Sequence, residues 1–142
     1  MTANVYRPHH MTLHPIHAIL LAGAVPLFLG AALSDIAYAY SYQIQWSNFA
    51  SWLIAGGLVF AGLAALCGLI GLAHAGGRGR RGLSYLALLL ATWLLGFINA
   101  LVHAKDAWAI MPMGLILSVI VTVLICAATG VRFSARRVGG EA

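Results

Sequence analysis

Six histidines are present in a chain of 142 residues that carries only eleven charged side chains, 8 Lys or Arg and 3 Asp or Glu. Imidazole nitrogen ligates haem iron and other metals, and it exchanges protons near neutral pH. A histidine beside a carboxylate or a second histidine therefore suits redox or proton chemistry. The sequence contains no nucleophile–base pattern, phosphate-binding loop or Cys-x-x-Cys motif, which argues against a hydrolase or kinase that acts alone.

The elements that must position these side chains are four long apolar stretches, at about residues 16–36, 50–72, 83–102 and 110–130. Hydrophobic residues make up 62% of the chain, and about 20 apolar residues allow a helix to cross a hydrocarbon core of about 30 Å. We predict an all-α integral membrane protein with four transmembrane helices in an antiparallel bundle. The transmembrane domain covers residues 14–130, between a polar tail at 1–13 and a basic tail at 131–142.

The basic residues predict how these helices are oriented. Only Lys105 falls on one side of the predicted bundle, and the other seven cations flank the opposite side: Arg7, Arg78, Arg80, Arg81, Arg132, Arg136 and Arg137. The positive-inside rule makes that side cytoplasmic, which places both termini inside a multi-pass protein of the bacterial inner membrane. The net charge of +5 is explained by this topology. We therefore predict that these residues lie beside the lipid bilayer and that the protein does not bind nucleic acid.

Depth along the helices sorts the polar residues into two sets. His17 and Asp35 lie 18 residues apart, about 27 Å along a helix, so they belong to opposite sides of the membrane. The inner set is His14, His17 and His74. We predict that His17 and His74 share one depth on neighbouring helices, which makes them candidate ligands of haem b or of another metal, with His14 as a third. The alternative is a structural role at the rim, as helix caps or contacts to headgroups and water.

The outer set is Asp35, Asn99 and His103, with Lys105 and Asp106 nearby. Polar groups are costly beside lipid unless they satisfy one another. We therefore expect these three side chains to form a cluster, and a structural clamp between the first and third spans is the preferred interpretation. A proton-handling site or a site for a quinone headgroup is the alternative.

Small residues recur at four-residue spacing in the second span, at Gly57, Ala61 and Ala65 and again at Ala64 and Gly68. A face of small residues lets two helices approach closely. We expect this face to pack within the bundle, and a homo-oligomer is the alternative use for it.

The chain resembles a bacterial membrane family catalogued as domain of unknown function 2231. The likeness covers residues 14 to about 130 and rests on His14-Pro15-Ile16-His17, Asp35-Ile36-Ala37-Tyr38, Trp52 to Val59, Asn99, and Pro112 to Ser118. The resemblance implies a four-helix membrane protein. Rieske-type iron–sulfur modules joined to some relatives imply a redox protein partner. The chain departs from the family where a histidine is expected near the start of the third span, because Ser84 and Tyr85 stand there.

Two functions follow from these observations. The first is a small membrane subunit of a redox system that transfers electrons through a b-type haem held by His17 and His74. It requires ring nitrogens about 4 Å apart across the iron. The second is a non-catalytic membrane anchor or assembly partner, whose histidines and Asp35 only fasten helices together.

Overall fold

A computed structural model of the chain describes residues 15–74 and 80–137, except for the side chains of residues 74 and 135–137. Over these ranges the chain forms no strand, and its helices are α1 (Pro15–Ser41), α2 (Ile44–His74), α3 (Arg80–His103), α4 (Ala107–Ile110) and α5 (Met113–Arg137). Helices α1, α2, α3 and α5 are each long and apolar enough to cross a membrane. The predicted fold class is confirmed, and the predicted tail at 1–13 and the ligand candidate His14 lie outside the described residues.

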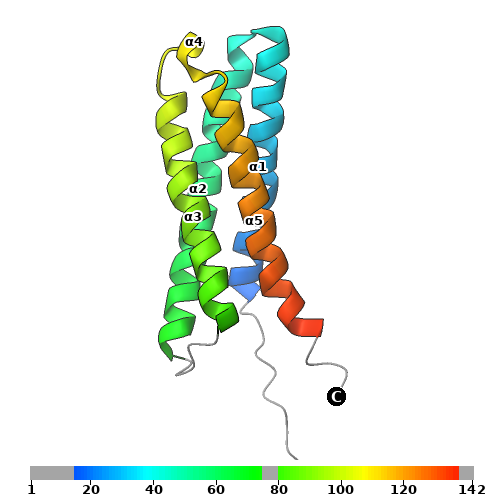
Figure 1. Ribbon diagram of the computed structural model, residues 1–142, viewed down its shortest axis with the longest axis vertical. Helices are drawn as coiled ribbons and strands as arrows, with labels where there is room; N and C mark the ends of the chain where they lie inside the picture. The colour runs from blue at the N-terminus through cyan, green and yellow to red at the C-terminus, as the bar shows by residue number, and fades with distance from the viewer. Residues whose placement is uncertain (1–14, 75–79, 138–142) are drawn as a thin grey trace, which may run out of the picture.

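The four long helices form a ring in which each packs against two neighbours. Helices α1 and α3 lie across from each other, and each contacts both α2 and α5. Successive long helices run in opposite directions (Figure 1), so α1 and α3 are parallel to each other. Any hydrogen bond between α1 and α3 must therefore cross the centre of the bundle.

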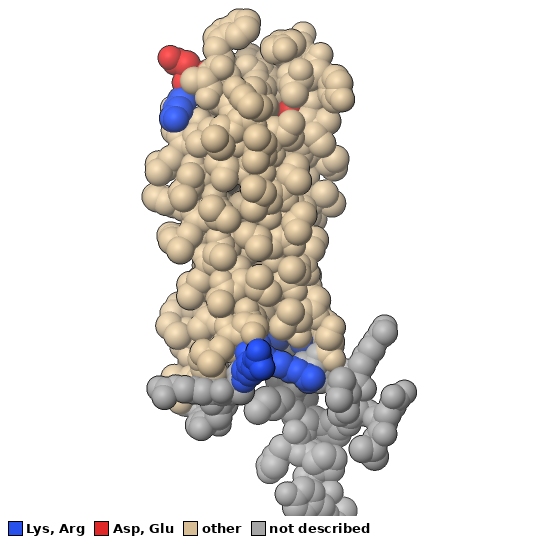
Figure 2. All heavy atoms as spheres, in the orientation of Figure 1, with Lys and Arg blue, Asp and Glu red and all other residues tan. Residues whose placement is uncertain are grey.

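The two ends of the bundle differ in chemistry. At one of them, called the basic end here, lie the first turn of α3 and the last turns of α5, with Arg80, Arg81 and Arg132. At the other, called the aromatic end, the exposed rings include those of Tyr40, Tyr42, Trp46 and Trp108, and the Tyr42 and Trp108 rings stack with centroids 6.4 Å apart. Between the ends, the face seen in Figure 2 is almost free of charged atoms, as contact with lipid requires.

Helices α1 and α2 extend beyond the apolar stretches that predicted them, and only Tyr42 and Gln43 separate them. Apolarity marks the part of a helix that lies in hydrocarbon, whereas backbone hydrogen bonding continues into the polar interface. The Tyr42 N–H still donates to Tyr38 O at 2.8 Å. The residues between the first two predicted spans are therefore mostly helical.

Pro112 divides the fourth apolar stretch, which sequence predicted as one span from residue 110. Proline has no N–H to donate and cannot continue α4. The Met111–Pro112 peptide bond is cis, and α5 starts directly afterwards, with the Ile116 N–H donating to Pro112 O at 3.1 Å. The fourth span therefore begins at Met113.

The small residues of α2 face the interior. Gly57, Ala61 and Ala64 are buried, and a Cβ built on Gly57 would lie only 2.8 Å from Phe28 Cε1 of α1. The absence of a side chain at Gly57 thus lets the Phe28 ring lie against the α2 backbone. This face packs within the bundle, as the sequence predicted.

Candidate functional site

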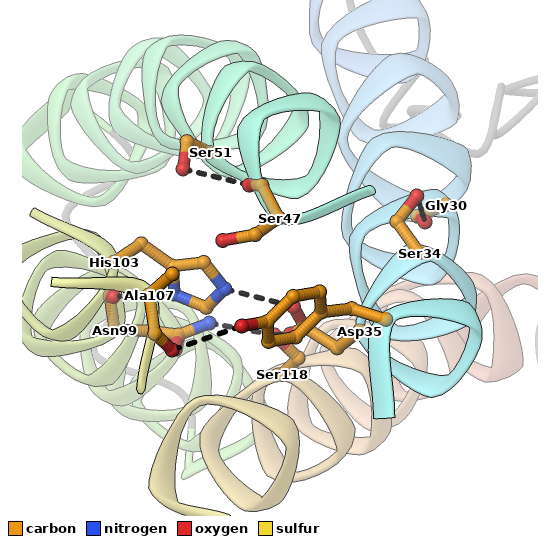
Figure 3. A network of polar contacts seen from close by, with 10 residues as sticks. Gly30, Ser34, Asp35, Ser47, Ser51, Asn99, His103, Ala107 and Ser118 are labelled. Atoms are coloured by element: carbon orange, nitrogen blue, oxygen red, sulfur yellow. Dashed lines mark hydrogen bonds and ion pairs between the residues drawn. The ribbon is translucent and has the colours of Figure 1, made fainter. Parts of the chain in front are cut away.

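A buried hydrogen-bond network at the aromatic end joins α1, α3 and α5 (Figure 3). Asp35 is completely buried, and its Oδ1 lies 2.8 Å from His103 Nε2. Its Oδ2 accepts a hydrogen bond of 2.5 Å from the Ser118 hydroxyl, and Ser118 Oγ accepts one of 2.7 Å from Asn99 Nδ2. The structure therefore brings Asp35, Asn99 and His103 together, and it adds Ser118, which sequence reasoning missed. We call these four residues the aromatic-end clasp.

The hydrogen bonds of His103 fix how many protons the clasp holds. His103 Nδ1 lies 3.0 Å from Asn99 O, and a carbonyl oxygen can only accept, so Nδ1 carries a hydrogen. Nε2 then either donates to an ionised Asp35 or accepts from a protonated one. In both cases the pair shares one proton and has no net charge. A neutral pair suits this site, because an unpaired charge buried in a bundle costs several kcal/mol.

Helical spacing explains how these side chains converge. Asn99 and His103 lie four residues apart on one face of α3. On α5, Gly114 lies four residues before Ser118, and a Cβ built on it would be 2.9 Å from His103 Cε1. Glycine at 114 therefore leaves the room that the imidazole occupies. A hydroxyl in an apolar helix gives no sequence signal of its own, because it can bond to its own backbone, as Thr122 does with Ser118 O at 2.7 Å.

Two further hydroxyls belong to this region. The Tyr38 hydroxyl, three residues after Asp35 on α1, donates to Ala107 O at 3.2 Å and so connects α1 to α4. Ser47 is a buried residue of α2, and its side chain points toward His103 in Figure 3. Asn99 Oδ1 is buried without a hydrogen-bond partner. All four long helices thus contribute a polar side chain to this end of the core.

A second contact between α1 and α3 lies near the basic end. His17 Nε2 is 2.8 Å from the Tyr85 hydroxyl, and both side chains are buried. The Arg132 guanidinium of α5 lies over the Tyr85 ring, 5.5 Å from its centroid. We call His17, Tyr85 and Arg132 the basic-end clasp. Tyr85 stands near where the family resemblance led us to expect a histidine, and it is the residue that His17 meets.

The two clasps repeat at the same spacing on both helices. His17 and Asp35 are 18 residues apart on α1, and Tyr85 and His103 are 18 residues apart on α3. At 3.6 residues per turn this is five turns, about 27 Å, so each helix presents both of its residues on the same face. Because α1 and α3 are parallel, the two contacts fit one relative position of the helices.

Comparison with known proteins agrees with this architecture. The family described as "Predicted membrane protein (DUF2231)" matches residues 13–136. The chain belongs to this family. No curated protein and no solved structure matches. The matched range includes every residue of both clasps of this DUF2231 protein.

Of the histidine set predicted for the inner rim of the DUF2231 protein, only the side chain of His17 is among the described residues. A Cβ built on Gly68 would lie 3.9 Å from His17 Cε1, so His17 is level with Gly68 of α2. His74 is the last residue of α2, six residues beyond Gly68 and so about 9 Å closer to the basic end along the helix. Its side chain and the whole of His14 lie outside the described part of the chain. Among the described residues, no three His, Cys, Asp or Glu side chains are grouped to hold a metal ion.

Proposed function

We propose that this DUF2231 protein is a non-catalytic membrane anchor or assembly partner, a rigid bundle on which another membrane protein is organised. One observation carries the proposal: within each clasp, the buried ionisable side chains of the core are hydrogen-bonded to each other. Both carboxylate oxygens of Asp35 and both ring nitrogens of His103 are hydrogen-bonded within the protein. Groups that already satisfy each other hold helices together and are not free to meet a substrate.

The position of the clasps supports this interpretation. Each one links α1 to α3, the two helices that face each other across the ring, and Ser118 or Arg132 adds α5. A bundle held in this way at both ends resists rotation and sliding of its helices. Its exterior carries large apolar side chains on every long helix, for example Leu33, Val59, Leu94 and Val123. Such a surface can contact lipid or the helices of a partner.

Electron transfer through haem b is the competing function, which the Rieske-type modules of some relatives suggest. It would use His17 and His74 as axial ligands. Two observations weigh against it: His17 Nε2 is already engaged by the Tyr85 hydroxyl, and His17 is level with Gly68, about 9 Å along α2 from His74. A redox protein remains the class of partner that those relatives favour for the anchor.

The proposal includes a topology. Arg80, Arg81 and Arg132 lie at one end of the bundle, and the positive-inside rule assigns that end to the cytoplasm of a bacterial inner membrane. The start of α1 and the end of α5 then face the cytoplasm, since both lie at the basic end (Figure 1).

Two measurements on the full chain separate the two functions. Protein purified from haem-replete cells should show no Soret band, and a band that disappears in a His17→Ala variant would establish the redox function instead. A photoreactive amino acid placed in cells at an exposed position of each long helix should give a discrete protein adduct from one face only. Suitable positions are those of Leu33, Val59, Leu94 and Val123. The lack of an adduct at all four would contradict the anchor function.

A further inference from the structure

Within the part of the chain that the structure describes, Arg132 at the basic end has no acidic partner. Only Asp35 and Asp106 supply carboxylates among the described residues, and both lie toward the aromatic end, near the end of α1 and just after α3. The first turns of α1 and α3, whose N-termini also point to the basic end, contain no acidic residue. The C-termini of α2 and α5 lie at the same end, so the helix dipoles largely cancel there and the positive charge is that of the arginines.

The guanidinium is held in place by the bundle. Arg132 follows Ala128, Ile125 and Val121 at helical spacing on the buried face of α5, so its stem leads out from the core. Its guanidinium lies 5.5 Å from the centroid of the Tyr85 ring. The Tyr85 hydroxyl is already hydrogen-bonded to His17, so the ring under the guanidinium is held by α1 as well as by α3.

One donor of this guanidinium lacks an acceptor. Arg132 Nε is buried and has no hydrogen-bond partner. An unpaired buried N–H is costly, and the cost is greater for a charged group. The residue as a whole is half-buried, and a guanidinium is a planar fork of donors whose geometry matches the oxygens of a phosphate group.

We propose that Arg132, positioned by Tyr85 and His17, is a binding site for a phosphate group at the basic end of the bundle. The same chemistry is offered by the headgroup of an anionic phospholipid and by free phosphate. The membrane setting makes a headgroup the nearer source, because basic pockets between transmembrane helices bind anionic headgroups. Arg80 and Arg81, exposed on the first turn of α3, add long-range attraction.

The test measures binding to the purified full chain in a neutral detergent. Native mass spectrometry reports the retention of dioleoylphosphatidylglycerol, with dioleoylphosphatidylcholine as the zwitterionic control, and equilibrium dialysis reports inorganic phosphate. We expect one phosphatidylglycerol per chain, retained in preference to phosphatidylcholine. Competition by inorganic phosphate identifies the free anion as a second source, and failure to compete assigns the site to the lipid. Equal retention of the two lipids, together with no bound inorganic phosphate, would overturn the proposal.

Matched variants locate the site. Arg132→Gln should weaken binding about tenfold or more, a loss of about 1.4 kcal/mol or more, whereas Arg81→Gln removes the same charge from an exposed position at the same end and should change it less than about threefold. Arg132→Lys keeps the charge but loses the planar fork of donors, so its affinity should fall between the two. This variant also gives the result if Arg132→Gln does not fold, as judged by circular dichroism. Equal losses of affinity in Arg132→Gln and Arg81→Gln would show that the anion is attracted by the overall positive charge of this end, and would refute a specific site at Arg132.

Discussion

Replacing Asp35 tests the shared-proton account of the aromatic-end clasp. In Asp35→Asn the side chain keeps its shape, and the network can be completed without the shared proton. The new amide donates to His103 Nε2, and its oxygen accepts from the Ser118 hydroxyl, so all the hydrogen bonds of the carboxylate are replaced. We expect this variant to lose less than about 1 kcal/mol of unfolding free energy, the net value of one hydrogen bond.

Apolar replacements should behave very differently. Asp35→Leu leaves His103 Nε2 unpaired, at about 1–3 kcal/mol. His103→Leu leaves a buried carboxylate without its partner, at about 3–5 kcal/mol. The double variant leaves only the Ser118 hydroxyl, which can bond to a carbonyl of its own helix, as the Thr92 hydroxyl does at 2.8 Å. The double variant should therefore cost less than His103→Leu alone.

The assay is a double-mutant cycle between Asp35 and His103. Unfolding of the full chain in mixed micelles by sodium dodecyl sulfate, followed by circular dichroism and tryptophan fluorescence, gives the four free energies. We expect a coupling energy of at least about 2 kcal/mol, well above the average of about 0.6 kcal/mol for one interhelical hydrogen bond in a membrane. A coupling energy near that average, or an Asp35→Asn variant as unstable as Asp35→Leu, would refute the shared-proton account.

Three further predictions concern the clasps and the topology. Tyr85→Phe removes the hydroxyl of the basic-end clasp and keeps the ring, so the same titration should show a loss of about 1 kcal/mol; an unchanged midpoint would mean that this hydrogen bond contributes nothing. Gly114→Ala places a methyl group 2.6 Å from Ile110 Cγ2 and 2.9 Å from Cε1 of the His103 imidazole, and it should cost about 1–3 kcal/mol. Gly130→Ala on the same helix meets nothing within 4 Å and is its control; equal effects would exclude the steric explanation. In a background without the two native cysteines, Lys105→Cys should react with a membrane-impermeant maleimide in intact cells and Arg81→Cys should not, and the reverse pattern would invert the proposed topology.

The sequence predicted the fold because hydropathy alone requires it. Lipid forces the apolar residues of each span into helices, and the structure has four helices that qualify as spans. The depths of Asp35, Asn99 and His103 were also predictable, since rise per residue converts position into depth. Their meeting with Ser118 was not, because a serine can satisfy itself within its own helix.

The inner rim shows where the same reasoning stops. Depth was counted from the ends of the apolar stretches, and α2 continues past its stretch to His74. His17 is consequently level with Gly68. A residue that sequence reasoning treated only as a departure from the family, Tyr85, occupies the place beside His17. Which helices face each other across a ring depends on packing, and hydropathy contains no information about packing.

The equal 18-residue spacing on α1 and α3 has a mechanical consequence for the proposed anchor. A rotation of α1 by one residue, about 100°, would turn His17 and Asp35 away from their partners at the same time. A slide of one turn would separate both pairs by about 5.4 Å. Neither movement can break one clasp and keep the other, so the two contacts select a single register of the parallel helices. The two clasps thus act together to fix the rotation and the axial position of α1 relative to α3. A partner that binds the apolar exterior therefore contacts helices whose exposed faces do not change.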